Sequence, residues 1–296
     1  MRVFLTGGTG YIGSAVAKGL RAAGHEVATL SRSGEKDEVA RSLGADPVRG
    51  DLADMGALAK ALEAYDALVH LAQDYRLGPS ADRRAIETLL GAARRAGGKR
   101  AVIYTSGIWV LGNVAQPTDE SGATTHPFAA VAWRPQHERD VLAAGSHELA
   151  VSVIRPGIVW GEKRGLFAPM LQSAQAEGAA AYVGPGEGRW SPIHRADLAE
   201  LYRRVLESHA SGIFHGVDGT SAPLVQIARA LSEAAGKKGA VRSVPIEEVR
   251  KRFGAAADAL AGDQVVVSRR GAEVGWVPRR PRFPEAAAAA WAEWKA

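Results

Sequence analysis

The octapeptide TGGTGYIG at residues 6–13 constrains the fold more than any other stretch of the chain. It follows directly on the apolar run Val3–Leu5, and its four glycines satisfy the spacing G-x-G-x-x-G. Glycines at this spacing let the backbone approach a phosphate closely, while the helix that follows presents unpaired N–H groups at its positive end. The glycines alone are a weak signal, but here a strand-like run precedes them and a helix-like run follows. The octapeptide therefore predicts a strand–turn–helix unit that binds a pyrophosphate.

Strand-like and helix-like runs alternate through the first half of the chain. Strands are predicted at Arg2–Thr6, Glu26–Ser31, Pro47–Gly50, Ala67–Leu71, Arg100–Thr105 and Ala150–Arg155. Apolar residues three and four apart predict helices at Ile12–Ala23, Glu35–Leu43, Met55–Leu62, Ala81–Ala96 and Gln136–Ala144. This alternation predicts an α/β fold, a doubly wound parallel sheet with helices on both faces.

The alternation breaks after Arg155, where the chain becomes rich in glycine. A helix and a strand that return to the sheet are predicted at Asp197–Glu207 and Gly212–Val217. Residues 220–296 are expected to form smaller, mostly helical elements, with a proline-broken basic connector at Pro278–Pro284 and a short terminal helix from Ala286.

Composition excludes several classes of site. The chain has no cysteine, which excludes disulfides, thiolate metal sites and cysteine nucleophiles. His126, His137 and His194 lack the spacing of metal ligands, so no metal site is expected. His194 and Asp197 are read instead as residues that cap the following helix, or as neighbours of the substrate.

The net charge of +5 raises the question of an anionic macromolecular partner. The basic residues are scattered, with clusters only at residues 269–270 and 279–282, so we expect solvated surface and no nucleic-acid partner. No window reaches the roughly 18–20 apolar residues that span a bilayer, and no signal-peptide pattern precedes the first strand. We therefore expect a cytoplasmic protein without a membrane partner.

Arg32 stands at the end of the second predicted strand, about twenty residues beyond the glycine turn. An acidic residue at this place binds the ribose 2′-OH of NAD, whereas an arginine accommodates the 2′-phosphate of NADP. The sequence therefore favours NADP over NAD, with Ser31 beside the phosphate. The alternative is a solvated arginine, with Glu35 or Asp37 reaching the ribose.

Six short stretches occur in the order typical of one known family. They are TGGTGYIG (6–13), GDLAD (50–54), VHLA (69–72), IYTSG (103–107), IRPGIVWG (154–161) and WSPIHRADLAELY (190–202). On these stretches the chain resembles the extended short-chain dehydrogenases/reductases, the nucleotide-sugar epimerase/dehydratase-like proteins. The resemblance covers nearly the whole chain, and it implies an NAD(P)-dependent protein with a small-molecule substrate.

The resemblance implies a Rossmann-type sheet with a smaller C-terminal substrate lobe. We expect an NADP-binding core over residues 1–160, rejoined by residues 190–217, and a substrate-binding lobe from residues 161–189 and 218–296. The residues expected to contact the cofactor are Gly7, Gly10, Tyr11, Ile12, Gly13, Ser31, Arg32, Asp51, Leu52, Leu71, Ala72, Gln73, Thr105, Arg134, Pro156, Gly157 and Ile158. For Leu52 and Leu71 a second interpretation stays open, that of core residues at strand ends.

The family's catalytic pattern is absent. Proteins of the family that this chain resembles have a catalytic triad of Ser or Thr, Tyr and Lys. The Tyr and the Lys are spaced Y-x-x-x-K, so that both lie on one face of a helix. This chain has no Tyr between residues 104 and 182 and no Lys between residues 99 and 163. One alignment with the family places Ala130 at the Tyr position and Arg134 at the Lys position. Shifting this alignment by three residues places Trp133 and His137 at these positions instead. The hydroxyl slot falls on Gly107.

Ser106, His137 and Tyr75 are the candidates for the missing proton donor. Ser106 directly follows the fifth strand, where it would otherwise only bond the backbone. His137 is a candidate because the unperturbed pKa of a histidine lies near neutrality, and the alternative is a surface histidine on a helix. Tyr75 would bring a phenol to the mouth of the site. Arg134 could hold the nicotinamide ribose in place of the lysine, but it stays protonated and cannot relay a proton.

Two hypotheses follow. The first is an NADP-dependent epimerase/dehydratase-like oxidoreductase with an atypical active site, acting on a small carbonyl or nucleotide-sugar-like substrate. The second is a non-catalytic protein that binds NADP(H) as a sensor or scaffold. A homodimer is a possible assembly for this family, but the sequence identifies no pairing surface.

Overall fold

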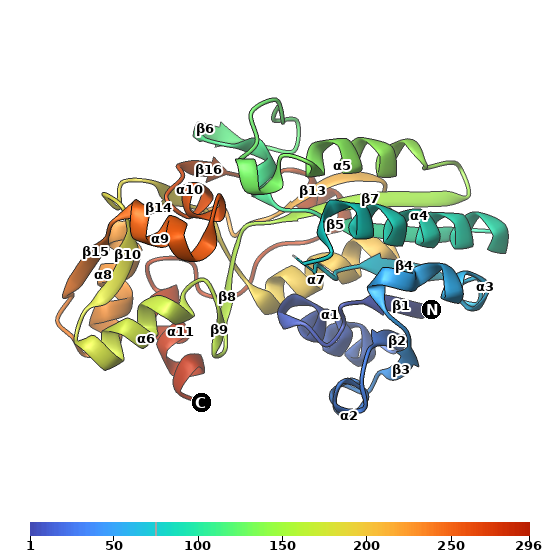
Figure 1. Cartoon of the computed structure of the whole chain (residues 1–296), viewed down its shortest axis with the longest axis horizontal. Helices are drawn as coiled ribbons and strands as arrows, with labels where there is room; N and C mark the ends of the chain where they lie inside the picture. Colours follow the sequence, from blue (N-terminus) through green and yellow to red (C-terminus); the bar gives the residue numbers. More distant parts are fainter. Residues whose placement is uncertain (75) are drawn as a thin grey trace.

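Seven parallel strands form the central sheet of the protein, in the order β13-β7-β5-β4-β1-β2-β3 (Figure 1). The computed structural model describes residues 1–74 and 76–296. The strands of this sheet are β1 (Arg2–Thr6), β2 (Glu26–Ser31), β3 (Asp46–Arg49), β4 (Ala67–His70), β5 (Arg100–Thr105), β7 (Leu149–Pro156) and β13 (Gly212–Gly216). The chain runs outward from β1 to β3 and then returns to β4, so the strand order reverses between β1 and β4. The predicted doubly wound α/β fold is confirmed.

Helices cover both faces of the sheet because its strands carry apolar side chains on both sides. Val3 and Leu5 of β1 pack with one layer of helices, whereas Phe4 between them packs with the other. The first layer holds α1 (Tyr11–Ala22) and α7 (Arg195–Glu207), and the second holds α4 (Gly78–Ala96) and α5 (Arg134–Ala143). Helix α2 (Gly34–Ser42) and the pair formed by the 3-10 helix Leu52–Leu58 and α3 (Ala59–Leu62) complete the first half.

A smaller lobe lies beside the sheet and has a core of its own (Figure 1). Trp160, Phe167, Leu171 and Leu231 are among the buried side chains of this core. The strands outside the central sheet are β6 (Val114–Thr118), β8 (Ile158–Gly161), β9 (Arg164–Gly165), β10 (Ala180–Val183), β11 (Arg189–Trp190), β12 (Pro192–His194), β14 (Ala222–Pro223), β15 (Val241–Val244) and β16 (Gln264–Val266). The remaining α-helices are α6 (Ala168–Glu177), α8 (Leu224–Ala234), α9 (Ile246–Phe253), α10 (Ala256–Leu260) and α11 (Ala286–Lys295).

One predicted helix differs from the structure, and one helix of the structure was not predicted. The helix predicted at Met55–Leu62 is a 3-10 helix that continues into one α-helical turn, and Asp54 interrupts it with φ −130° and ψ 53°. The 3-10 segment begins earlier than predicted because the Asp51 side chain accepts from the Ala53 N–H and caps it. Helix α6 was not predicted, because glycines surround it and Pro169 stands in its first turn. No helix within residues 1–74 and 76–296 is long and apolar enough to cross a bilayer.

Candidate functional site

The turn between β1 and α1 is built so that only glycine fits at several positions. Gly7 has φ +69°, and a Cβ there would lie 2.7 Å from the Ala72 nitrogen. A Cβ on Gly13 would overlap the carbonyl oxygen of Gly7. Helix α1 begins directly after Gly10, with no side-chain cap and no acidic residue in its first turn. The turn therefore presents a positive helix end and unpaired N–H groups, which suits the pyrophosphate of a dinucleotide.

Thr6 joins this turn to the end of β4. The N–H groups of Leu71 and Ala72 each donate to Thr6 Oγ1 at 3.2 Å, and His70 Nδ1 lies 2.7 Å from the same oxygen. The carboxyl ends of β1 and β4 are therefore held together where the strand order reverses. In open α/β sheets, ligands bind in the crevice at this switch point.

Arg32 directly follows β2 at the carboxyl edge of the sheet. Its guanidinium is about half exposed, and Nη1 is 3.2 Å from Asp74 Oδ2. Hydrogen bonds from Arg76, and a further one from Arg32, lower the pKa of Asp74. Ser31 donates to the carbonyl of Ser33, whose own hydroxyl caps α2. The Arg32 side chain is thus held near the β4 loop by a solvent-exposed pair.

The two residues expected at the adenine have different environments. Asp51 is exposed, and its carboxylate caps the 3-10 helix by accepting from Ala53. Leu52 is 6 % exposed and belongs to the core beneath α4. Leu71, the other leucine with two interpretations, is partly buried against the core on the α1 side.

Arg134, the first residue of α5, joins the ends of β4 and β5. Its Nη1 donates to the Thr105 carbonyl at 3.1 Å, and its Nη2 donates to Gln73 Oε1 at 2.6 Å. The guanidinium carbon lies 5.0 Å from the centre of the Trp133 ring. The structure therefore brings Gln73, Thr105 and Arg134, which lie in separate segments of the sequence, together.

Two hydroxyls follow each other at the end of β5 and have different surroundings. Thr105 Oγ1 lies 2.7 Å from the hydroxyl of Tyr202, a fully buried residue of α7 whose pKa is raised by that burial. Ser106 is 7 % exposed, and its Oγ has no hydrogen-bond partner among the described residues. Tyr202 therefore acts as a hydrogen-bonding group rather than as an acid or base, and Ser106 keeps a free donor.

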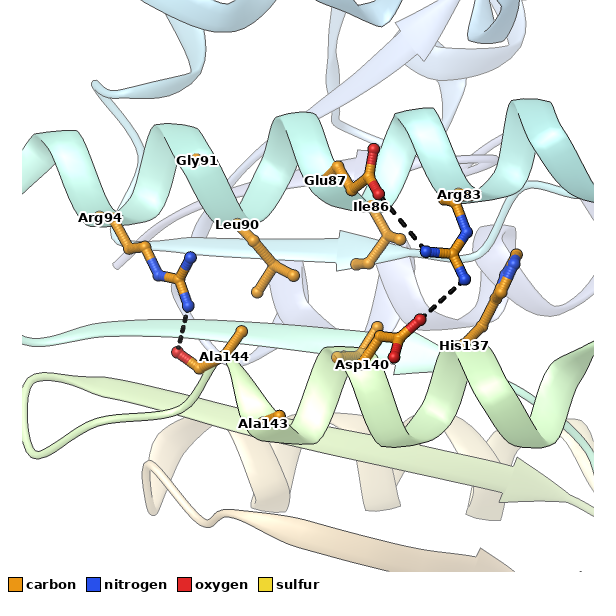
Figure 2. A pocket seen from close by; sticks show the side chains of 11 residues that line it. Arg83, Ile86, Glu87, Leu90, Gly91, Arg94, His137, Asp140, Ala143 and Ala144 are labelled. Atoms are coloured by element: carbon orange, nitrogen blue, oxygen red, sulfur yellow. Dashed lines mark hydrogen bonds and ion pairs between the residues drawn. The ribbon is translucent and has the colours of Figure 1, made fainter.

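His137 is buried and not a surface histidine, since it is only 6 % exposed. Its Nδ1 lies 3.0 Å from Asp82 Oδ2 on α4. It also lines a groove of about 340 Å³ between α4 and α5, together with Arg83, Leu90 and Asp140. Figure 2 shows the groove on the side of these helices away from the central sheet. Tyr75, the third candidate, lies outside the described residues.

Asp82 is the centre of a buried polar cluster that the sequence interpretation missed. Its carboxylate contacts His70 Nε2 at 3.2 Å, the Tyr104 hydroxyl at 2.8 Å and His137. Burial raises the pKa of Asp82, but hydrogen bonds from His137 and His70 outweigh it, and the pKa lies below its ordinary value. The sequence contains one signal of this cluster, because Asp82 lies on the same apolar face of α4 as Ala85 and Ile86. A carboxylate buried on such a face needs hydrogen-bond partners. Within the described chain, no group of three or more acidic or histidine side chains could hold a metal ion.

Tyr11, in the first turn of α1, links the glycine turn to the lobe. Its hydroxyl donates to the Gly161 carbonyl at 2.9 Å. Arg195 donates to the Tyr11 carbonyl at 2.8 Å and lies over its ring, with 4.9 Å between the guanidinium carbon and the ring centre. Burial raises the pKa of the Tyr11 phenol, so the phenol stays protonated and serves as a donor.

His194 caps α7, as one of the two interpretations predicted. Its Nδ1 accepts from the Ala196 N–H at 3.1 Å, and its Nε2 lies 3.1 Å from Glu293 of α11. Asp197 accepts from the backbone N–H groups of Arg279 and Arg280 and thereby fixes the basic connector. Both residues therefore hold the lobe against α7.

Pro156, Gly157 and Ile158 lie where β7 leaves the central sheet. The Gly157 N–H donates to the Gly216 carbonyl at 2.9 Å, and a Cβ on Gly157 would overlap the carbonyl oxygen of Ser191. Ile158 is buried in the core of the lobe. These residues therefore form the fixed boundary between the sheet's carboxyl edge and the lobe.

Comparison with known proteins agrees with this architecture. Residues 3–215 match the model of the NAD dependent epimerase/dehydratase family. An uncharacterised protein of Saccharomyces cerevisiae is 32% identical over 95% of this chain and 95% of its own. The 4-hydroxy-2-methyl-3-oxo-4-farnesyl-3,4-dihydroquinoline-1-oxide ketoreductase of Stigmatella aurantiaca is 31% identical over 84% of this chain and 78% of its own.

A solved structure of the human epimerase family protein SDR39U1 with NADPH is also similar. It superimposes with a TM-score of 0.83 at 25% identity and covers 99% of both chains. The sheet order, the glycine turn at its switch point and the matched residues lead to one conclusion. The chain belongs to the NAD-dependent epimerase/dehydratase family, whose members are NAD(P)-binding oxidoreductase-like proteins.

Proposed function

We propose that the protein is an NADPH-dependent reductase of a small carbonyl compound, with an active site that works without the Tyr-x-x-x-Lys pair. The observation that carries the proposal is the pairing of two features at one edge of the sheet. The glycine turn suits a dinucleotide, and two buried donors without a partner among the described residues lie near the end of β5: Oγ of Ser106, directly after the strand, and Nε of Arg134, at the start of α5. The ketoreductase among the relatives supports a carbonyl rather than a nucleotide-sugar substrate.

The chain offers a continuous set of contacts for NADPH. The pyrophosphate would lie on the turn, at Gly7, Gly10, Tyr11, Ile12 and Gly13. The adenosine end would lie between Ser31, Arg32, Asp51 and Leu52, and the nicotinamide end among Leu71, Ala72, Gln73, Thr105, Arg134, Pro156, Gly157 and Ile158. The exposed guanidinium of Arg32 supports NADP over NAD because it can pair with a 2′-phosphate. A similar protein of known structure was solved with NADPH.

The bound cofactor would supply a hydride to the carbonyl carbon. The chain's own part is to orient the carbonyl and to stabilise its oxygen as negative charge develops there. Ser106 Oγ is the hydroxyl with a free donor for this oxygen. The proton that completes the alcohol comes from water, because Arg134 stays charged and His137 Nδ1 is engaged by Asp82.

A second function is favoured by one observation, the absence of the Tyr-x-x-x-Lys pair. Without it, the protein would bind NADP(H) as a sensor or scaffold and would reduce nothing. In this case the donors at Ser106 and Arg134 would bind only the nicotinamide end of the cofactor.

One experiment separates the two functions. The purified full chain is titrated with NADPH, and NADPH oxidation is followed by absorbance with a panel of linear and cyclic ketones, oxo acids and UDP-glucose. We expect NADPH binding and turnover of at least one ketone or oxo acid. Tight NADPH binding with no turnover of any panel member would contradict the reductase and leave the sensor.

A further inference from the structure

Arg134 differs from the other buried arginines of the described chain. Arg134, Arg155 and Arg195 are each at most 6 % exposed. Arg155 forms a bidentate pair with Glu138, with Nη2 2.6 Å from Oε2, and Arg195 pairs with Glu162. Among the described residues Arg134 forms no ion pair, and its two hydrogen-bond acceptors are neutral oxygens. A buried charge without a counter-charge costs several kcal/mol.

The position of Arg134 on its helix adds to this imbalance. It is the first residue of α5, where the helix carries partial positive charge, and the first turn contains no acidic residue. Two further buried donors nearby are unpaired among the described residues: Nε of Arg134 itself and Oγ of Ser106. The Thr105 carbonyl that Arg134 binds belongs to the residue directly before Ser106. A buried positive charge is therefore bound one residue along the chain from a second buried donor without a partner among the described residues.

The geometry points to an anion, and the cofactor does not supply one here. In the proposed cofactor site the phosphates of a dinucleotide would lie at the glycine turn and at Arg32, and its nicotinamide ribose carries only neutral hydroxyls. The anion would therefore belong to the substrate. A guanidinium is a planar fork that can bind a carboxylate in two parallel hydrogen bonds, and in Arg134 the Nε–H still has no partner among the described residues.

We propose that Arg134 binds a carboxylate of the substrate while Ser106 donates to the neighbouring carbonyl oxygen, so that the substrate is an oxo acid. This assignment rests on the proposed reductase function. In the reaction NADPH gives a hydride to the carbonyl carbon and the carbonyl oxygen takes up one proton from the solvent, so that oxo acid, NADPH and H⁺ give the hydroxy acid and NADP⁺. The carboxylate is unchanged and serves only to bind and orient.

The test uses acids and esters that differ only in charge. Pyruvate, acetoacetate and levulinate, each beside its methyl ester, are titrated into the NADP⁺-loaded full chain, with tryptophan fluorescence as the readout. The same six compounds are assayed for reduction by NADPH. The variants are Arg134→Met, Arg134→Lys and, as a control on the exposed side of the same helix, Arg139→Met, whose side chain donates a hydrogen bond to Gln136.

We expect at least one acid to bind at least tenfold more tightly than its ester. Arg134→Met should remove this preference, and Arg134→Lys should keep part of it because the charge remains without the fork. Arg139→Met should keep all of it. If Arg134→Met fails to bind NADP⁺ or unfolds at a low temperature, Arg134→Lys takes its place. The ratio of its affinities for an acid and the methyl ester is then compared with the same ratio in the wild-type protein.

Three outcomes contradict the assignment. The first is that no acid binds better than its ester in the wild-type protein, whether or not either is reduced. The second is a preference that persists in Arg134→Met. The third is an Arg134→Met variant that loses NADPH affinity and weakens acid and ester equally, which would place Arg134 at the nicotinamide ribose. Acid binding without reduction would keep the carboxylate site and remove the reductase function.

Discussion

The Oδ2 atom of Asp82 lies 3.0 Å from Nδ1 of His137 and joins α4 to α5 beneath the carboxyl edge of the sheet. The hydrogen bonds that lead to Asp82 have one consistent direction. Because Leu71 and Ala72 donate to Thr6 Oγ1, the Thr6 O–H is free to donate to His70 Nδ1. His70 then donates from Nε2 to Asp82. The wall of the candidate cofactor site is thereby anchored to one buried carboxylate.

Asp82→Asn should lower the free energy of unfolding by about 3 kcal/mol, because it removes a buried charge that three donors share. Denaturant unfolding followed by circular dichroism measures this change. Asp140→Asn is the matched control, since Asp140 forms an exposed pair with Arg83 on the same two helices. Its effect should stay within about 0.5 kcal/mol. Equal effects in the two variants would contradict the central role of Asp82.

His215 should make stability depend on pH between its ordinary pKa and its folded one. Burial lowers the pKa of His215 from 6.5 to about 4; Glu120 opposes the shift and Arg155 adds to it. The folded protein therefore keeps this imidazole neutral, whereas the unfolded chain takes up a proton below pH 6.5. His215 therefore makes its full contribution to the free energy of unfolding above pH 6.5. This contribution decreases by about 3 kcal/mol as the pH falls toward 4.

The His215→Asn variant tests this, because asparagine keeps a donor that can reach the Val267 carbonyl. Unfolding free energies measured from pH 7 to pH 4 should fall less steeply in the variant than in the wild type. His209→Asn, at an exposed histidine, should keep the wild-type slope. A wild-type slope in His215→Asn would show that other groups cause the pH dependence.

Arg32→Ala should weaken NADP⁺ binding about tenfold or more relative to NAD⁺ binding, since a charge-assisted bond to the 2′-phosphate contributes about 1.5–3 kcal/mol. Arg76→Ala is the matched control, because Arg76 also pairs with Asp74 and is more exposed. It should change both affinities little. Calorimetry with the two cofactors measures the ratio, and a loss that is equal for NADP⁺ and NAD⁺ would contradict the assignment of Arg32.

Gly13→Ala should abolish dinucleotide binding, because the added Cβ overlaps the Gly7 carbonyl oxygen and forces the turn apart. Gly19→Ala in the same helix is the control. There an added Cβ would lie 3.8 Å from the Cβ of Ala199, an ordinary contact. That variant should bind normally and gain up to about 1 kcal/mol of stability from helix propensity. NADPH fluorescence titration and thermal melting provide both readouts.

Local signals were sufficient to predict the sheet and the glycine turn. The alternating and helical patterns of apolar residues, together with the turn glycines, predict the bounds of all seven strands of the sheet to within about one residue. This is possible because a strand and a glycine turn each depend mainly on residues that are close in the sequence. The side chain of His194 could likewise be read as a helix cap, since a cap involves residues two positions apart.

The surroundings of the candidate catalytic residues could not be read in this way. The bonds from Asp82 to His70, Tyr104 and His137 connect four elements, and their distances depend on how α4 and α5 pack on the sheet. The burial of Arg134 without an acid partner likewise appears only once α5 is docked. The assignments of cofactor and catalytic residues therefore stay predictions that the variants above can test.

The junction at Gly157 has a consequence for how the substrate lobe can change. One residue separates β7 of the central sheet from β8 of the lobe, and it is clamped between the Gly216 and Ser191 carbonyls. A connection this short and this crowded leaves no length for a hinge. Relatives that accept different substrates are therefore expected to differ in the side chains and loops beyond β8. The connection between β7 and β8 is expected to stay one residue long in these relatives, with glycine at that position.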